Sequence, residues 1–136
     1  MARYVIELEK GGCFELEFDP AAPKTAEAFQ RFVDSQTEPY QALCLQGRFS
    51  GEEIYFPAPL GDTGPENNVT PVHGSVAFNQ NPEWSAICVY WGDDIAEKKH
   101  YHNRFAKITG DLEELRKVGT RIWQKGGETA TLRKLD

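Results

Sequence analysis

Residues 14–32 read FELEFDPAAPKTAEAFQRF, and this segment is the most informative in the chain about its architecture. Phe14 to Phe18 alternate apolar residues with glutamates, which predicts a strand with one face in water. Two prolines follow and cannot be absorbed into a central strand. Apolar residues then recur at helical spacing, so we expect a helix from about Ala22 to Asp34.

Strands and turns are expected on both sides of this unit. Tyr4 to Leu8 alternate in the same way, and the pair Gly11–Gly12 predicts a hairpin with the strand that starts at Phe14. Downstream strands are expected twice within residues 42–56, and once each in residues 75–78, 86–91 and 103–109.

The end of the sequence predicts one more helix and one more hairpin. Asp111 is a typical helix-capping residue, and Gly119 is a typical residue after the last turn. We therefore expect a helix between them. Residues 120–135 then predict two strands joined around Gly126–Gly127.

Together these elements predict a mainly β protein with a single domain, residues 1–136. About eight strands with two short helices are typical of a closed β-barrel. A chain of 136 residues can bury one hydrophobic core and is too short for two. The residues expected to face that core are Phe14, Leu16, Phe18, Phe29, Ala77, Ile87, Val89 and Ile108.

Several segments resemble cyclophilins, and they follow one another in the same order. The segments are Ala22-Pro23-Lys24-Thr25 with Phe29, Gly74–Phe78, Ser85–Trp91 and Asn103–Ile108. A closer resemblance is to compact bacterial cyclophilin-like proteins of a family with no assigned function. It is carried by Arg48–Glu53, Pro57, Glu66–Asn67, Glu83, Asn103–Phe105 and the ending Ile122–Thr131. The resemblance implies a cyclophilin-like closed β-barrel, and it implies no reaction.

The charge of the chain argues against two classes of partner. The formal net charge is −6 and the isoelectric point is near 5.1. Nucleic-acid-binding proteins usually present a basic face that displaces counterions, and anionic membranes select for basic proteins in the same way. We therefore expect no nucleic-acid partner and no membrane partner.

The cysteines and the first residues indicate a cytoplasmic protein without metal or cofactor. Cys13, Cys44 and Cys88 are odd in number and lack CxxC spacing, so we expect reduced thiols with no role in metal binding. The first eight residues include Arg3 and Glu7, which a signal peptide would not contain in its apolar part.

Three histidines are candidates for a metal site. His100 and His102 have the spacing to point the same way from an extended segment, and His73 could add a third nitrogen. No carboxylate or cysteine follows at ligand spacing, so a solvated histidine pair is the preferred interpretation. No metal site is expected, and no nucleophile or phosphate-binding motif is present.

The predicted site combines one cation with nearby carboxylate, hydroxyl and amide groups. A loop rich in proline and glycine, residues 57–65, cannot join the sheet and should lie over the rim of the barrel. A cation with carboxylate, hydroxyl and amide groups above an apolar barrel favours the binding of a small polar or carboxylated ligand. The expected ligand-binding residues are Arg48, Glu52, Tyr55, Glu66, Asn67 and Asn103.

Two alternatives stay open at this point. Cyclophilins isomerise prolyl bonds with an arginine, and Arg48 is the candidate for this role here. Glu52 and Glu53 follow closely, and a neighbouring carboxylate would occupy the Arg48 guanidinium. Efficient prolyl isomerisation is therefore not expected. A proline-peptide binder belongs to the same alternative. The third class is a structural interaction protein that forms a homo-oligomer through an exposed edge of the barrel. Separately, Trp84 in a polar loop could cover a pocket or contact a second subunit.

Overall fold

The computed structural model describes residues 3–47, 51–93 and 102–135. Within these residues the chain forms eight strands and two helices. The strands are β1 Arg3–Leu8, β2 Cys13–Phe18, β3 Tyr40–Gln46, β4 Glu53–Pro57, β5 Ser75–Asn79, β6 Ala86–Tyr90, β7 His102–Ile108 and β8 Glu128–Leu135. The helices are α1 Pro23–Asp34 and α2 Leu112–Lys125.

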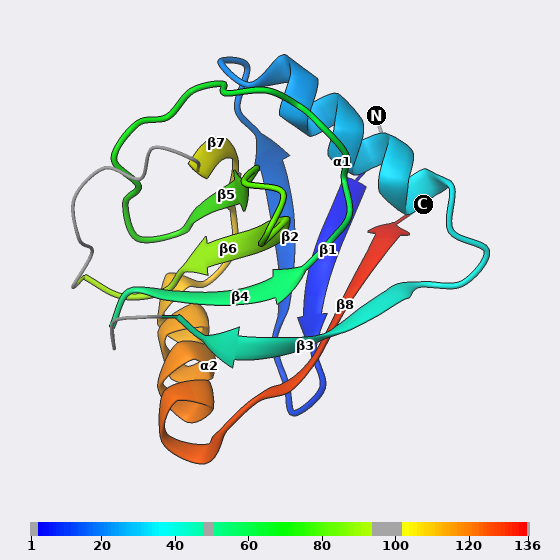
Figure 1. The fold of residues 1–136 in the computed structure, drawn as a ribbon. Coiled ribbons are helices and arrows are strands. Elements are labelled where there is room, and N and C mark those ends of the chain that lie inside the picture. The colour runs from blue at the N-terminus through cyan, green and yellow to red at the C-terminus, as the bar shows by residue number, and fades with distance from the viewer. Residues whose placement is uncertain (1–2, 48–50, 94–101, 136) are drawn as a thin grey trace.

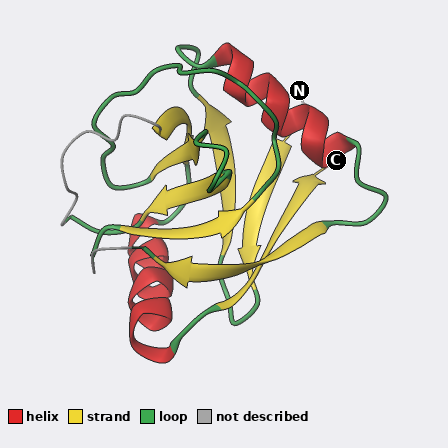
Figure 2. Ribbon diagram, in the orientation of Figure 1, coloured by secondary structure: helices red, strands yellow, loops and turns green. Residues whose placement is uncertain are grey.

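The strands close into an antiparallel barrel, as the alternating sequence predicts (Figure 1). Their order is β1-β2-β7-β5-β6-β4-β3-β8, and pairing between β8 and β1 completes the circle. The two helices lie at opposite ends of the barrel (Figure 2). The predicted mainly β fold with a closed eight-stranded barrel and two helices is confirmed.

The helices close the barrel ends with apolar side chains. Phe29 of α1 is fully buried, and its ring meets Tyr4 and Phe18 edge to face at centroid distances of 5.6 and 5.8 Å. From α2, Leu115 and Val118 enter the same core. Burial of each large apolar side chain contributes about 1.5–3 kcal/mol.

Ala77 differs from the other residues expected in the core. It is buried, but it packs with Cys88 and Tyr90 on the outer face of the sheet, while Val76 and Phe78 face inward. Ala77 is therefore buried as expected, but the expectation that it points into the barrel was wrong, because a short strand covered on both faces has no polar face to set its phase. Of the other seven, Phe18 packs against the core and the remaining six lie within it.

The end of the chain also differs from expectation. Gly119 does not end the second helix, which continues through residues 120–123 to Lys125. A Cβ on Gly119 would lie 1.9 Å from a ring carbon of Trp91, so this glycine permits close packing of the helix. The true terminus is Gly126, with φ of +93°, and a single strand follows where a hairpin was expected.

The segment between β4 and β5 is a long loop without helix or strand, residues 58–74, as its prolines and glycines predict. In Figure 1 this green segment runs past the start of α1 before it reaches β5. None of the helices in the described part of the chain has the length and apolar character needed to cross a membrane.

Candidate functional site

The long loop brings three of the six predicted site residues together. Glu66 and Asn67, with their neighbour Asn68, lie against the first residues of β7, where Asn103 stands. We call Glu66, Asn67, Asn68 and Asn103 the loop clamp. Every member makes hydrogen bonds within the chain.

Asn103 is the centre of the loop clamp and is fully buried. Its side-chain oxygen accepts from the backbone N–H of Glu66 at 3.0 Å and from the side-chain amide of Asn68 at 2.7 Å. Its own amide donates to the hydroxyls of Thr25 and Thr63 and to a loop carbonyl. Both polar atoms of this side chain are therefore committed to the fold.

Glu66 caps helix α1 from a distance. The capping position is occupied by Ala22, which has no side chain that can accept a hydrogen bond. The Glu66 carboxylate accepts instead from the backbone N–H groups of Lys24 and Thr25, at 3.0 and 2.8 Å, and from the Thr25 hydroxyl. Burial raises the pKa of Glu66, but these hydrogen bonds and the charge of Lys24 outweigh it, so the pKa is lowered overall.

Asn67 joins the loop to two strands. It adopts a positive φ of 48°, which asparagine tolerates better than most residues. Its side-chain amide donates to the Arg104 carbonyl at 2.8 Å and to the carboxylate of Asp19 at 3.2 Å. Its backbone carbonyl accepts from the Arg104 N–H. The structure thus uses Asn67 to hold the loop beside β7 and the end of β2.

The other three predicted site residues lie elsewhere or are not described. Glu52 immediately precedes β4 and is fully buried, and its carbonyl accepts from the Trp91 N–H at 2.9 Å. Tyr55 is partly buried on the outer face of β4, where it packs against the cluster that contains Ala77. Arg48 lies outside the described residues.

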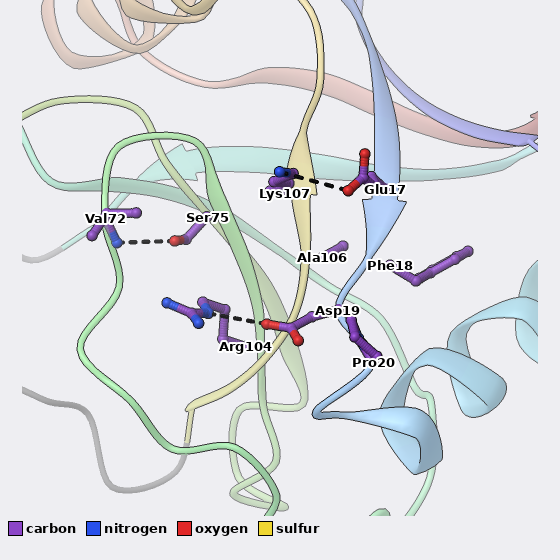
Figure 3. Close-up of a pocket in the computed structure, with 9 residues that line it drawn as sticks. All are labelled: Glu17, Phe18, Asp19, Pro20, Val72, Ser75, Arg104, Ala106 and Lys107. Atoms are coloured by element: carbon purple, nitrogen blue, oxygen red, sulfur yellow. Dashed lines mark hydrogen bonds and ion pairs between the residues drawn. The ribbon is translucent and has the colours of Figure 1, made fainter.

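One hollow on the outside of the barrel, which we call the Arg104 hollow, has a volume of about 330 Å³. Its lining residues come from the end of β2, the loop before β5, and β5 and β7 (Figure 3). They are Glu17, Phe18, Asp19, Pro20, Val72, Ser75, Arg104, Ala106 and Lys107. The hollow therefore combines apolar surface with two acidic and two basic side chains.

Arg104 is the notable cation of this hollow. Its Nε lies 3.4 Å from Asp19 Oδ2, with 30% of the Arg104 side chain exposed. Figure 3 shows its two terminal nitrogens on the side away from Asp19, toward Val72. Among the described residues, no hydrogen bond or ion pair engages these two nitrogens. They can donate to a bound anion.

Two further polar groups border the same hollow. The Ser75 hydroxyl accepts from the Val72 N–H at 2.9 Å, which leaves its hydrogen to donate. Lys107 lies 3.6 Å from Glu17, and both side chains are largely exposed. The hollow thus offers donors from Arg104, Ser75 and Lys107 beside the apolar side chains.

Another hollow lies over the outer face of β4 and β6 and has a volume of about 440 Å³; we call it the β4–β6 hollow. Its lining residues are Gln46, Gly47, Glu53, Tyr55, Asn79, Trp84, Ala86, Cys88 and His102. Trp84 lies at its border and is 57% exposed. Ligand atoms of Glu53, Cys88 and His102 lie within 4.8 Å of one another, so these residues could hold a metal ion.

The thiols and the buried tyrosine differ in their surroundings. All three cysteines are free; Cys13 is exposed, while Cys44 and Cys88 are buried. Burial and the charge of Glu128 raise the pKa of Cys44 to about 12.

Tyr90 lies beside Cys88, and its hydroxyl is buried. Burial, together with the negative charges of Cys88, Glu53 and Glu52, raises the pKa of Tyr90 far above the ordinary value. Tyr90 therefore stays a neutral hydroxyl.

Neither Arg104 nor His102 is among the ligand-binding residues expected from the sequence, which indicated His102 only as part of a solvated histidine pair. His102 is the first residue of β7. Arg104 lies between the buried Asn103 and Phe105. Strand alternation could therefore have shown that Arg104 faces outward. Its proximity to Asp19 follows only from the pairing of β2 with β7.

Solved structures of other proteins share this fold. McbB in complex with tryptophan has a TM-score of 0.69 at 18% identity, and the match covers 96% of this chain. It covers 44% of McbB, so the chain spans less than half of that protein. The hypothetical protein AF2241 from Archaeoglobus fulgidus has a TM-score of 0.67 at 25% identity, covering 96% of this chain and 92% of AF2241.

A cyclophilin-type peptidyl-prolyl cis-trans isomerase from Cryptosporidium parvum, crystallised in the presence of the dipeptide Ala-Pro, is also similar. Its TM-score is 0.67 at 14% identity, and the match covers 98% of this chain and 97% of the isomerase. No model of a protein family matches the sequence, and no curated protein matches it. The chain has a cyclophilin-like fold.

Proposed function

We propose that this protein binds a small carboxylated ligand in the Arg104 hollow. The observation that carries the proposal is the guanidinium of Arg104, held by Asp19 through Nε with both terminal nitrogens turned away from that carboxylate (Figure 3). A planar guanidinium held in this way is suited to donate two hydrogen bonds to one carboxylate. Ser75 adds a hydroxyl donor at the same surface.

The remaining lining limits the size and character of the ligand. A volume of about 330 Å³ is near the lower end for small-molecule sites, so the ligand has the size of an amino acid. Phe18, Val72 and Ala106 offer apolar contacts for its body. Glu17 would place a negative charge near a ligand ammonium, so zwitterions fit the hollow as well as simple carboxylates.

The predicted residues support this site indirectly. Asn67 bonds to both Asp19 and the backbone of Arg104, so it fixes the ion pair that orients the guanidinium. Glu66 and Asn103 hold the loop that carries Asn67. Under this proposal the loop clamp positions the site, and Arg104 takes the cationic role that the sequence suggested for Arg48.

A thermal-shift screen tests the proposal. The panel contains small carboxylates and amino acids, and each compound is compared with its amide, which lacks the carboxylate. Tryptophan is included because the structure of McbB was solved in complex with it. A true ligand at about a hundred times its Kd stabilises the fold by about 2.7 kcal/mol. The carboxylate should raise the melting temperature, the amide should not, and Arg104→Gln should remove the effect.

Arg116→Gln is the matched control, because Arg116 is a partly exposed arginine of α2 paired with Asp93. It should keep the full ligand response. An equal response in Arg104→Gln, or an equal response to acids and amides, would show that the hollow does not recognise a carboxylate.

Prolyl isomerisation or proline-peptide binding is the second candidate, and it has the likeness to the isomerase with Ala-Pro in its favour. A proline-containing test peptide separates the two functions. A carboxylate-binding protein leaves the rate of cis-trans isomerisation unchanged, whereas an isomerase accelerates it. Cytoplasmic location and homo-oligomer formation stay predictions.

A further inference from the structure

Three potential metal ligands come from three strands on the outer face of the barrel. Glu53 of β4 pairs with Tyr90 of β6, and Cys88 lies two residues before Tyr90, so the carboxylate and the thiol are diagonal neighbours. His102 begins β7, and β5 separates it from β6. On β5 the residue opposite His102 is Asn79 and the residue opposite Cys88 is the small Ala77, so His102 and Cys88 lie diagonally across β5.

The ligand atoms of these residues are already close. One atom each from Glu53, Cys88 and His102 lies within 4.8 Å of the other two. Glu53 is 7% exposed, Cys88 is 2% exposed and His102 is half-buried, so this is not a surface cluster of acids. Atoms that surround a metal at 2.0–2.3 Å stand roughly 3–4 Å apart, and a small closure brings these three into that range.

We propose that Glu53, Cys88 and His102 bind one zinc ion. Sulfur, nitrogen and oxygen together are the ligand set that Zn²⁺ accepts, whereas Mg²⁺ and Ca²⁺ prefer oxygen alone. A thiolate and a carboxylate would balance the charge of the ion. This inference is independent of the Arg104 hollow, and it differs from the sequence-based expectation that no cysteine binds a metal.

A hydrogen bond behind His102 fits this role. Its Nδ1 lies 2.6 Å from the hydroxyl of the fully buried Tyr90. In the tautomer in which Nδ1 donates to that oxygen, Nε2 carries the lone pair that a metal requires. Histidine ligands in proteins are usually oriented in this way by a partner on the other nitrogen. Tyr90 is therefore a positioning residue.

The site opens to the β4–β6 hollow, which Tyr55 and Trp84 also line. Three protein ligands leave a fourth tetrahedral position for water or another small molecule, as in zinc sites that act on substrates. The structural zinc sites of small domains instead use four protein ligands. The proposed ion would therefore be accessible from the hollow.

Metal titration of the reduced, full-length protein tests the proposal. We expect one equivalent of Zn²⁺ to bind, and Co²⁺ to give the near-ultraviolet charge-transfer absorption of a thiolate ligand. Cys88→Ser should remove this absorption. Tyr90→Phe should keep the absorption and weaken zinc binding about tenfold. His102→Gln and Glu53→Gln each remove a ligand atom and should weaken zinc binding more than Tyr90→Phe does.

The other two cysteines serve as controls. Cys44→Ala removes a second buried thiol, and Cys13→Ser removes the exposed one; both should leave binding unchanged. Circular dichroism establishes whether each variant is folded. If Cys88→Ser does not fold, the loss of zinc affinity in His102→Gln tests the proposal instead. The proposal fails if a roughly tenfold excess of zinc gives no stoichiometric binding, or if Cys13→Ser rather than Cys88→Ser abolishes the absorption.

Discussion

Asn103 and Arg104 are consecutive residues of β7, yet they belong to regions with opposite properties. Asn103 is fully buried in the loop clamp, and both its oxygen and its amide bond within the chain. Arg104 faces the outside, is 30% exposed, and is held by Asp19 through one nitrogen of three. The comparison shows that neighbouring polar residues of one strand differ in the hydrogen bonds that they leave open, and under the proposed function only the residue with free donors contacts the ligand.

Removal of Asn103 should have the largest effect on stability. Asn103→Ala leaves the Glu66 N–H, the Asn68 amide and a loop carbonyl without their partner, and each buried group left unsatisfied costs about 1–3 kcal/mol. We expect a loss of about 3 kcal/mol in the free energy of unfolding, measured with urea. Asn81→Ala removes one acceptor from an exposed turn and should cost under about 1 kcal/mol. Equal losses in the two variants would contradict the structural role of Asn103.

Glu66→Ala should have an intermediate effect, because it removes the acceptor at the start of α1. Ala22 cannot replace this acceptor, so two helix N–H groups lose their partner. Loss of a helix cap typically costs about 1 kcal/mol, and urea unfolding at neutral pH measures it. Ala22→Ser in the Glu66→Ala background offers a local cap and should recover part of the loss.

The contribution of Glu66 should depend on pH in a defined direction. Its pKa is lowered in the folded protein from the ordinary value of 4.5. Such a carboxylate contributes its full stabilisation above the unfolded pKa and loses it as the pH falls through the folded pKa. The difference in unfolding free energy between the wild type and Glu66→Ala should therefore be constant above about pH 5.5 and shrink in more acidic solution. If this difference in unfolding free energy instead grew as the pH fell, the lowered pKa of Glu66 would be contradicted.

The elements of the fold were predictable where the sequence contains local signals. Alternation from Phe14 to Phe18, the prolines after it and the helical spacing up to Asp34 all depend on neighbouring residues, and they placed β2 and α1 correctly. Gly119 misled the prediction because a glycine that ends a helix and a glycine that admits Trp91 look the same in a sequence. Only the packing partner distinguishes the two.

The candidate site was less predictable because its contacts are long-range. Residues 66–67 and Asn103 were correctly singled out as a group, but the sequence does not show that their donors and acceptors meet one another across some 37 positions. Asp19 and Arg104 are likewise joined only through the pairing of β2 with β7. One signal was available: a helix that starts Ala22-Pro23 lacks a local cap and needs an acceptor from elsewhere.

Arg104→Gln should have the smallest effect on stability and the largest on binding. Its ion pair with Asp19 is partly exposed, so its loss should cost under about 1 kcal/mol, and less still in about 1 M salt. A double-mutant cycle with Asp19→Asn measures the pair itself, and we expect a coupling of about 0.2–1 kcal/mol. Asp19 also accepts from Asn67 and from the Ala21 N–H, so Asp19→Asn alone should cost more than Arg104→Gln. If Arg104→Gln instead destabilised the protein by about 3 kcal/mol, as expected for Asn103→Ala, Arg104 would belong to the loop clamp, and its guanidinium could not be the free donor that a carboxylate needs.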